Sequence, residues 1–80
     1  MGWVLFSRRG CHLCEAAEDL VQELCPGADV VDVDCDPGVR QQYGLRVPVI
    51  EIDGVVAAEG RIERRDVERL AAGGRSDAEP

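Results

Sequence analysis

The sequence predicts a small α/β protein whose four-stranded mixed sheet is flanked by helices, in the order βαβ, a short helix, then ββα. Two observations predict this class. Within residues 2–34, an apolar β-rich run, an amphipathic run and a second β-rich run follow one another, and such a unit pairs its strands in parallel. Further on, two β-rich runs meet at Asp53-Gly54, a dipeptide typical of hairpin turns. A parallel unit joined to an antiparallel hairpin gives a mixed sheet.

The first half of the chain supplies a strand, a helix and a second strand. Residues 1–7 are apolar on both parities, which is typical of a strand buried on both faces. Apolar residues then recur at helical spacing over residues 13–24, and the helix is expected to end at residues 25–27, Cys-Pro-Gly. Valine and aspartate alternate within residues 28–34, which predicts the second strand.

The second half supplies a short helix, the hairpin and a last helix. Asp36-Pro37 is typical of an N-cap followed by proline at the first helical position, and Gly44 stands where a C-terminal cap belongs. Residues 49–53 and 55–59 are the predicted hairpin strands. Residues 60–72 carry apolar side chains at helical spacing and precede two glycines, which predicts a helix that packs on the sheet.

Composition restricts the function classes. Eighty residues suffice for one domain, and a net charge of −7 argues against nucleic-acid binding. All nine basic residues are arginine, so lysine Schiff-base and P-loop chemistry are excluded. We find neither a signal peptide nor an apolar run near the roughly 18 residues of a membrane span. We therefore expect a cytoplasmic monomer that contacts no membrane.

Cys11 and Cys14 open the predicted first helix, directly after the first strand. Free N–H groups and the macrodipole at a helix start favour a thiolate at Cys11, and Arg8 and Arg9 add positive charge beside it. A thiolate is the nucleophile in disulfide exchange, and Cys14 lies one turn further on, close enough to attack the resulting mixed disulfide. The spacing and its context predict a two-thiol redox centre.

The strand, the C-x-x-C at a helix start and Arg46-Val47-Pro48 before the hairpin together resemble glutaredoxin, within the thioredoxin-fold superfamily. The resemblance covers about residues 2–72, and we expect a glutaredoxin-like domain over residues 1–73 followed by a flexible tail, residues 74–80. Asp34-Cys35-Asp36-Pro37, Tyr43-Gly44 and Val47-Pro48-Val49 are similar to small glutaredoxin-like proteins without a settled substrate. In the superfamily the proline is cis and lies beside the cysteines, and the residue before it binds substrate through its backbone. The resemblance assigns these roles to Pro48 and Val47.

Departures from glutaredoxin concern glutathione. Glutaredoxins that use glutathione usually carry threonine where Arg46 stands, an aromatic residue where Leu13 stands, and a Gly-Gly-x-Asp type turn before the last helix. Here that turn reads Glu59-Gly60-Arg61-Ile62-Glu63, in which Gly60 matches a close-approach glycine and the aspartate has no counterpart. We therefore expect weak or no glutathione binding. Arginines gathered near the thiols would attract carboxylates, which leaves glutathione open as a reductant or co-substrate; they are Arg8, Arg9, Arg46 and Arg61.

We expect a thiol–disulfide oxidoreductase in which Cys11 attacks and Cys14 resolves. Its partner would be a disulfide-containing protein or a small-molecule thiol, with no bound cofactor and no metal. His12 lies inside the motif and is interpreted as tuning the thiolate rather than as a catalytic base. The predicted substrate-binding set is Arg8, Arg9, His12, Leu13, Arg46, Val47, Pro48 and Gly60.

Alternative functions remain at this stage. An iron–sulfur carrier would hold a cluster between Cys11 of two chains and two external thiols, and a non-catalytic interaction module would keep the cysteines without turnover. A zinc site needs four convergent ligands, but Cys25 and Cys35 are isolated cysteines. We expect Cys25 to be a small apolar cap residue and Cys35 a packed thiol at a strand end, with redox sensing as the alternative for Cys35. The aromatic residues Trp3, Phe6 and Tyr43 are expected in the core.

Overall fold

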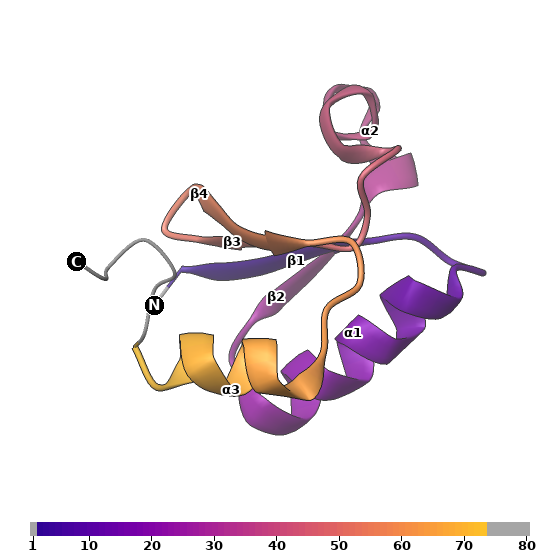
Figure 1. Cartoon of the computed structure of the whole chain (residues 1–80). Coiled ribbons are helices and arrows are strands. Elements are labelled where there is room, and N and C mark those ends of the chain that lie inside the picture. Colours follow the sequence, from indigo (N-terminus) through magenta and orange to yellow (C-terminus); the bar gives the residue numbers. More distant parts are fainter. Residues whose placement is uncertain (1, 74–80) are drawn as a thin grey trace.

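The computed structural model describes residues 2–73 and contains a four-stranded mixed sheet with helices on both faces (Figure 1). The order of elements predicted from the sequence is confirmed, and a short 3₁₀ helix is added after the second strand. The predicted flexible tail lies outside the described residues. The elements are β1 (Trp3–Ser7), α1 (His12–Leu24), β2 (Asp29–Asp32), η1 (Val33–Cys35), α2 (Pro37–Tyr43), β3 (Val49–Ile52), β4 (Val55–Glu59) and α3 (Arg64–Ala71).

The sheet has the strand order β2-β1-β3-β4, which places β1 between a parallel and an antiparallel neighbour. Ser7, the last residue of β1, is level with Asp32 at the end of β2. On the other side Phe6 is level with Val49, the first residue of β3. The loop from β1 to α1 and the segment that precedes β3 therefore lie at the same end of the sheet.

The sheet separates two apolar clusters, and β1 contributes to both. Trp3 and Leu5 pack with α1 and α3 on one face, whereas Phe6 packs with Tyr43 of α2 on the other. Figure 1 shows α1 and α3 below the sheet and α2 above it. The predictions that β1 is buried on both faces and that the three aromatic residues belong to the core are confirmed. Among the described helices, none has the length and apolar character to cross a membrane.

Helix α2 has the capping residues that its sequence predicts. The Asp36 carboxylate accepts hydrogen bonds from the backbone N–H groups of Gly38 (2.9 Å) and Val39 (3.2 Å), and proline is the first helical residue. Gly44 ends the helix without entering the left-handed region, since its φ is −57°. A Cβ at this position would lie 2.5 Å from the Arg40 carbonyl oxygen. The need for glycine here is therefore one of space.

The hairpin between β3 and β4 turns at the predicted dipeptide. Asp53 has φ 54° and Gly54 has φ 84°, so both central residues of this two-residue loop are left-handed. Such a turn matches the right-handed twist of the paired strands, and β3 and β4 pair directly beside it, with Ile52 opposite Val55.

Strand β2 is shorter than predicted, and this changes the position of Cys35. The alternation of valine and aspartate predicts a strand to Asp34, but β2 ends at Asp32. The Asp32 carboxylate accepts a hydrogen bond from the Asp34 backbone N–H at 2.9 Å, a local turn that competes with strand pairing. The chain therefore enters η1. The prediction that Cys35 is a packed thiol at a strand end is wrong, because Cys35 is exposed at the end of η1.

Helix α3 begins later than predicted. The apolar spacing suggested a helix from residue 60, whereas α3 starts at Arg64 after the N-cap residue Glu63. The Asp66 carboxylate accepts a hydrogen bond from the Glu63 backbone N–H at 2.9 Å, which satisfies one free donor at the helix start. Gly60 has φ 79° and so cannot be helical. Residues 60–63 form a loop between β4 and α3.

Candidate functional site

Cys11 is the N-cap of α1, and its sulfur takes part in the cap. Its backbone is extended (φ −106°, ψ 115°), and its Sγ accepts a hydrogen bond from the Cys14 backbone N–H at 3.3 Å. The sequence placed Cys11 inside the helix start; the structure places it one position earlier. At the N-cap the sulfur faces the free N–H groups of the first turn and the positive end of the helix dipole.

The two thiols of the motif have different environments. Cys11 is partly exposed, whereas Cys14 in the first turn of α1 is fully buried (0% exposed). Burial, followed by hydrogen bonding with Cys11, raises the pKa of the Cys14 thiol from 9.0 to about 11. The Arg8 backbone N–H and the Ser7 hydroxyl act in the opposite direction by hydrogen bonding to the thiolate form. Cys14 therefore holds its proton more firmly than an ordinary thiol.

The Val47-Pro48 segment meets the expectation for its geometry. The peptide bond between these residues is cis. It precedes β3 at the end of the sheet where the loop from β1 to α1 also starts. Pro48 is buried and Val47 packs against the cluster of the α2 face. The Pro48 carbonyl accepts a hydrogen bond from the Gly60 backbone N–H at 2.9 Å. Gly60 therefore lies beside Pro48.

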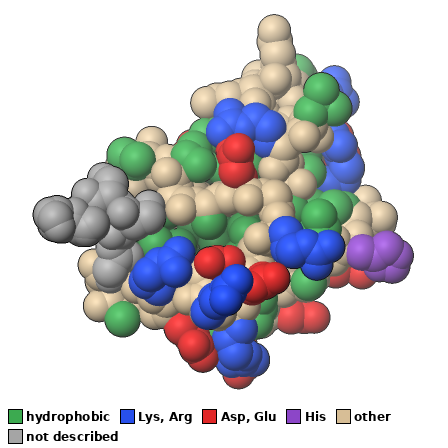
Figure 2. Space-filling model, viewed as in Figure 1, with side chains coloured by type: hydrophobic (Ala, Val, Ile, Leu, Met, Phe, Trp, Pro, Cys, Tyr) green, Lys and Arg blue, Asp and Glu red, His purple; other side chains and the backbone are tan. Residues whose placement is uncertain are grey.

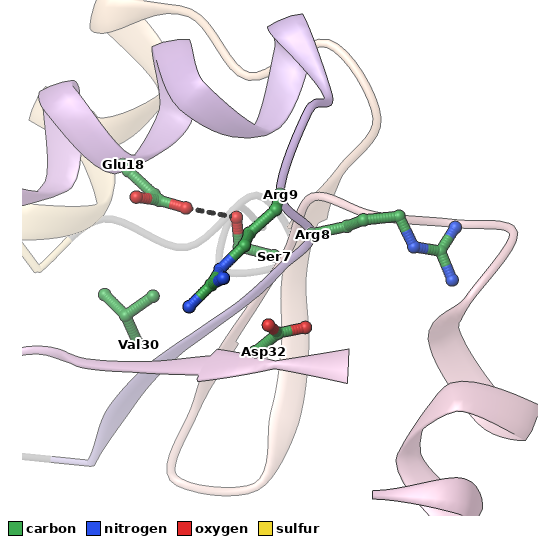
Figure 3. Close-up of a pocket in the computed structure, with 6 residues that line it drawn as sticks. All are labelled: Ser7, Arg8, Arg9, Glu18, Val30 and Asp32. Carbon is green, nitrogen blue, oxygen red and sulfur yellow. Dashed lines mark hydrogen bonds between the residues drawn. The ribbon is translucent and has the colours of Figure 1, made fainter. Parts of the chain in front are cut away.

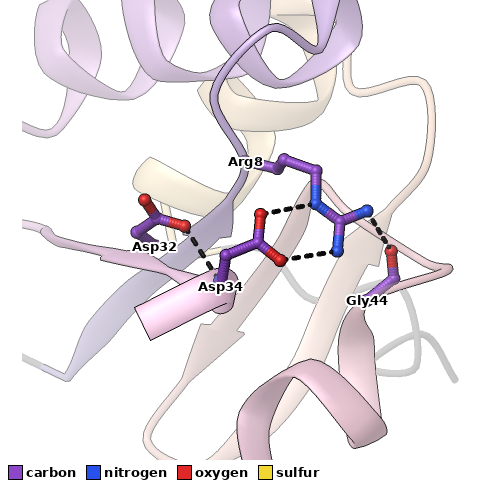
Figure 4. A network of polar contacts seen from close by, with 4 residues as sticks. All are labelled: Arg8, Asp32, Asp34 and Gly44. Atoms are coloured by element: carbon purple, nitrogen blue, oxygen red, sulfur yellow. Dashed lines mark hydrogen bonds and ion pairs between the residues drawn. The ribbon is translucent and has the colours of Figure 1, made fainter. Parts of the chain in front are cut away.

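Arg8 connects three segments at this end of the sheet (Figure 4). Its guanidinium donates to the two carboxylate oxygens of Asp34 at 2.9 and 3.0 Å and to the Gly44 carbonyl at 2.9 Å. The guanidinium holds the pKa of the Asp34 carboxyl below its usual value by hydrogen bonding and by charge. Arg8 is therefore engaged with a carboxylate of η1. That carboxylate raises the pKa of Arg8 by its hydrogen bond, and the charges of Cys14 and Cys11 add smaller contributions in the same direction.

Arg46 is engaged in the same way. It forms an ion pair with Glu59 of β4, and its guanidinium carbon lies 5.1 Å from the centre of the Tyr43 ring. A guanidinium over an aromatic face gains a cation–π contact. Two of the four arginines predicted to attract carboxylates to the site, Arg8 and Arg46, are thus already paired with carboxylates of this chain.

The remaining predicted residues lie on the surface. His12 and Leu13 are exposed in the first turn of α1, where Leu13 is 40% exposed. Arg61 is exposed in the loop before α3, distant in sequence from the motif. Arg9 is also exposed and reaches into a cavity of about 230 Å³ between α1 and β2 (Figure 3).

That cavity contains polar residues that the sequence analysis did not single out. Ser7 is 2% exposed and its hydroxyl donates a hydrogen bond of 2.5 Å to Glu18 Oε2. A serine at the end of an otherwise apolar strand, and a glutamate four residues after Cys14, were the available signals. The residues around the cavity are Ser7, Arg8, Arg9, Glu18, Val30 and Asp32.

The other two cysteines lie apart from the motif. Cys25 caps the C-terminus of α1 and packs against the cluster formed with α3, which confirms its predicted structural role. Cys35 is exposed on η1. Within residues 2–73 no group of three or more histidine, cysteine or acidic side chains is arranged to hold a metal ion.

Sequence comparison finds relatives over most of the chain. A family model described as Glutaredoxin-like domain (DUF836) matches residues 3–73. Uncharacterized proteins of Mycobacterium tuberculosis and Mycobacterium bovis are 34% identical in an alignment 59 residues long, and the match covers 62% of this chain and 61% of theirs. The chain thus spans about three fifths of the length of these curated relatives.

Two solved structures are similar in fold. A structural genomics target protein, XcR50 from X. campestris, aligns with a TM-score of 0.76 at 24% identity, over 91% of this chain and 99% of its own. A mutant thioredoxin from Halobacterium salinarum aligns with a TM-score of 0.63 at 26% identity, over 98% of this chain and 76% of its own. The sheet order, the dithiol at the start of α1 and the family match lead to one conclusion: the chain belongs to the glutaredoxin-like domain family, with a thioredoxin fold.

Proposed function

We propose that the protein is a thiol–disulfide oxidoreductase in which Cys11 is the nucleophile and Cys14 the resolving thiol. The observation that carries the proposal is the inequality of the two thiols. A partly exposed sulfur at a helix N-cap stands one turn before a fully buried thiol whose pKa is raised to about 11. Disulfide exchange uses this division of roles, because the thiolate attacks and the second thiol displaces the product.

The reaction transfers two electrons from the dithiol to the substrate. The Cys11 thiolate attacks one sulfur of a substrate disulfide, forms a mixed disulfide and expels the other substrate sulfur as a thiolate. Cys14 then loses its proton and attacks the Cys11 sulfur, which forms the Cys11–Cys14 disulfide and releases the second substrate thiolate. The Cys14 N–H to Cys11 Sγ contact of 3.3 Å holds the two residues in the required proximity.

The substrate class in this proposal is a disulfide of a protein or a small molecule. The Val47 backbone beside the cis proline would bind the substrate chain, and the exposed Leu13 would contact it. The pairing of Arg8 and Arg46 with carboxylates of the chain supports weak glutathione binding, because less free positive charge is left for the glutathione carboxylates. We propose that the protein acts as a monomer in the cytoplasm, where thiols are kept reduced.

The test is reduction of a protein disulfide, with dithiothreitol as the electron source and insulin as the substrate. Cys11→Ser should abolish the reduction. Cys14→Ser should still attack and then accumulate a mixed disulfide that mass spectrometry detects, since no second thiol resolves it. Cys35→Ser is the matched control, because it removes an exposed thiol outside the motif and should leave the rate unchanged. Full activity of Cys11→Ser contradicts the proposal.

A further inference from the structure

Two loops form the candidate site: the Cys11 loop, residues 8–11, and the Val47 loop, residues 44–48. Both lie at the end of the sheet where β1 pairs with β3. In the proposed function, a substrate disulfide reaches the Cys11 sulfur while the substrate chain lies along the Val47 backbone. The rate of attack therefore depends on how firmly the two loops are held relative to each other.

Arg8 joins these two loops beyond the end of the sheet (Figure 4). It lies three residues before Cys11, and the two residues between them are exposed. Its Nη1 donates a partly buried hydrogen bond of 2.9 Å to the carbonyl oxygen of Gly44, which lies three residues before Val47. One side chain of the Cys11 loop thus holds the start of the Val47 loop.

Asp34 fixes the direction of the Arg8 guanidinium. Its carboxylate accepts from Nε at 2.9 Å and from Nη2 at 3.0 Å, and Nη1 is left to bond the Gly44 carbonyl. The Asp34 backbone is itself held in η1 by the hydrogen bond to the Asp32 carboxylate. A two-point contact of this kind is more constrained than an ordinary exposed ion pair.

The end of α2 leaves room for this arrangement. A Cβ on Gly44 would lie 3.3 Å from Arg8 Nη2, so a larger residue would press on the guanidinium. The Arg46 N–H donates to the Tyr43 carbonyl at 2.8 Å, which makes the chain around Gly44 a hydrogen-bonded turn, and Val47 follows it directly. The position of the Gly44 carbonyl therefore affects the position of the Val47 backbone.

We propose that Arg8 is a positioning residue, oriented by Asp34, that holds the Cys11 loop against the Val47 loop. This inference rests on the proposed function and gives Arg8 a role other than the attraction of substrate carboxylates. The role matters for a disulfide whose chain lies along the Val47 backbone, as in a polypeptide. It matters little for a disulfide too small to reach that backbone. Arg8 thus favours polypeptide substrates.

A role through charge alone makes the opposite prediction for Asp34. If Arg8 acted only as a positive charge near the dithiol, removal of the Asp34 carboxylate would leave that charge uncompensated. The reactivity of Cys11 toward any disulfide would then rise. If Arg8 positions the loops, the same removal loosens them and slows attack on a polypeptide disulfide. Asp34→Ala therefore separates the two roles.

The measurement compares two disulfides that release the same coloured product. One is dithiodipyridine, and the other is an uncharged, acetylated and amidated hexapeptide whose single cysteine forms a mixed disulfide with thiopyridine. The Cys11 thiolate bonds to one sulfur and thiopyridone leaves, which stopped-flow absorbance follows. In the parent protein, Cys14→Ser, Cys25→Ala and Cys35→Ala leave Cys11 as the only thiol. The ratio of the peptide rate to the dithiodipyridine rate cancels changes in the reactivity of the thiolate itself.

Arg8→Gln and Asp34→Ala should each lower this ratio by about tenfold, the order expected for the loss of a hydrogen bond to a charged group. Arg8→Lys should lower it as well, because lysine keeps the charge but lacks the planar fork. Glu23→Ala is the matched control. It breaks the 2.8 Å ion pair with Arg64 between α1 and α3, about 18 Å along α1 from Cys11, and should leave the ratio unchanged. Circular dichroism confirms that each variant is folded.

The inference is overturned if Asp34→Ala raises both rates, if Arg8→Gln keeps the ratio of the parent protein, if Arg8→Lys restores that ratio, or if Glu23→Ala lowers it equally. Failure of the proposed function gives a different result, because the protein with all its cysteines then reduces no insulin. Failure of the inference alone leaves that insulin reduction intact.

Discussion

The folded protein stabilises the neutral thiol of Cys14 relative to the thiolate. The neutral thiol fits a fully buried position, whereas the thiolate would lose its hydration there. Folding therefore raises the pKa of this thiol from 9.0 to about 11. A group with a raised pKa keeps its proton in the folded state after the unfolded chain has released it, so stability falls as the pH rises between the two values.

The free energy of unfolding of the reduced protein should accordingly fall between pH 9 and pH 11, by on the order of 2 kcal/mol. Below pH 9 this contribution is fully present. Urea unfolding followed by circular dichroism at pH 8 and pH 10.5 measures it. Cys14→Ala removes the titrating group and should flatten the dependence over this range. An equal fall in Cys14→Ala would assign the effect to other groups.

At the scale of elements, α2 depends on its caps and its packing. Seven residues are too few for a helix that is stable on its own. Tyr43 fixes the helix to the sheet, with its ring centroid 4.7 Å from that of Phe6 and its hydroxyl bonded to the Glu51 carboxylate. The N-terminus is held by Asp36, which accepts from two backbone N–H groups. Helix α2 leads directly into the segment before Pro48. The stability of α2 therefore also affects the position of Pro48 at the candidate site.

Asp36→Ala should lower the free energy of unfolding by about 1 kcal/mol, since it removes the N-cap of α2. Asp19→Ala makes the same change of charge on an exposed position of α1 and should fall within about 0.5 kcal/mol of the parent. Urea unfolding at pH 7 compares the three proteins. Equal stability of the Asp36 variant and the parent would show that the proline at the first helical position suffices to start the helix.

For the whole molecule, the excess of acidic residues outweighs the local arginines. The net charge is −7, and Arg8 and Arg46 are paired with carboxylates. On the face seen in Figure 2, arginine and acidic side chains are interspersed and form no large patch of one sign. The long-range field should therefore attract cationic disulfides and repel anionic ones.

Cystamine, a disulfide with two positive charges, should react faster with the reduced protein than oxidised glutathione does at low ionic strength. Added sodium chloride should slow the first reaction and speed the second, because screening shortens the reach of the field. Stopped-flow measurement of tryptophan fluorescence, from Trp3, or quenched mass spectrometry follows both reactions. Rates for glutathione disulfide that fall with salt would instead reveal a local site for its carboxylates.

The features predictable from the sequence are those that depend on neighbouring residues. The C-x-x-C spacing places two thiols on one turn, and Asp36-Pro37 and Asp53-Gly54 set a helix start and a hairpin by local geometry alone. Where two local preferences competed, prediction failed: the alternation that favours a strand to Asp34 gave way to the turn made by Asp32. Because β2 ends earlier than predicted, Cys35 lies on η1 and is exposed.

Contacts between segments that lie far apart in the sequence could not be predicted from it. Arg8 meets Asp34 across 26 residues, and Ser7 meets Glu18 across 11. Both pairs depend on the register between strands and on the seat of α1 over the sheet, which no short pattern encodes. The sequence thus identified the two thiols of the candidate site, but neither the partner of Arg8 nor the contact between Ser7 and Glu18.

The irregular pairing of β3 with β4 bears on how the molecules behave when crowded together. β4 is an outermost strand, and its Val55 is 68% exposed, so it offers a row of backbone groups to any other chain. The register shifts between Ile50 and Glu51, and a bulge of this kind twists an edge away from the flat form that strand addition requires. The opposite edge, β2, is only four residues long and begins and ends with aspartate. Both edges of the sheet are therefore poor templates for aggregation into cross-β fibrils.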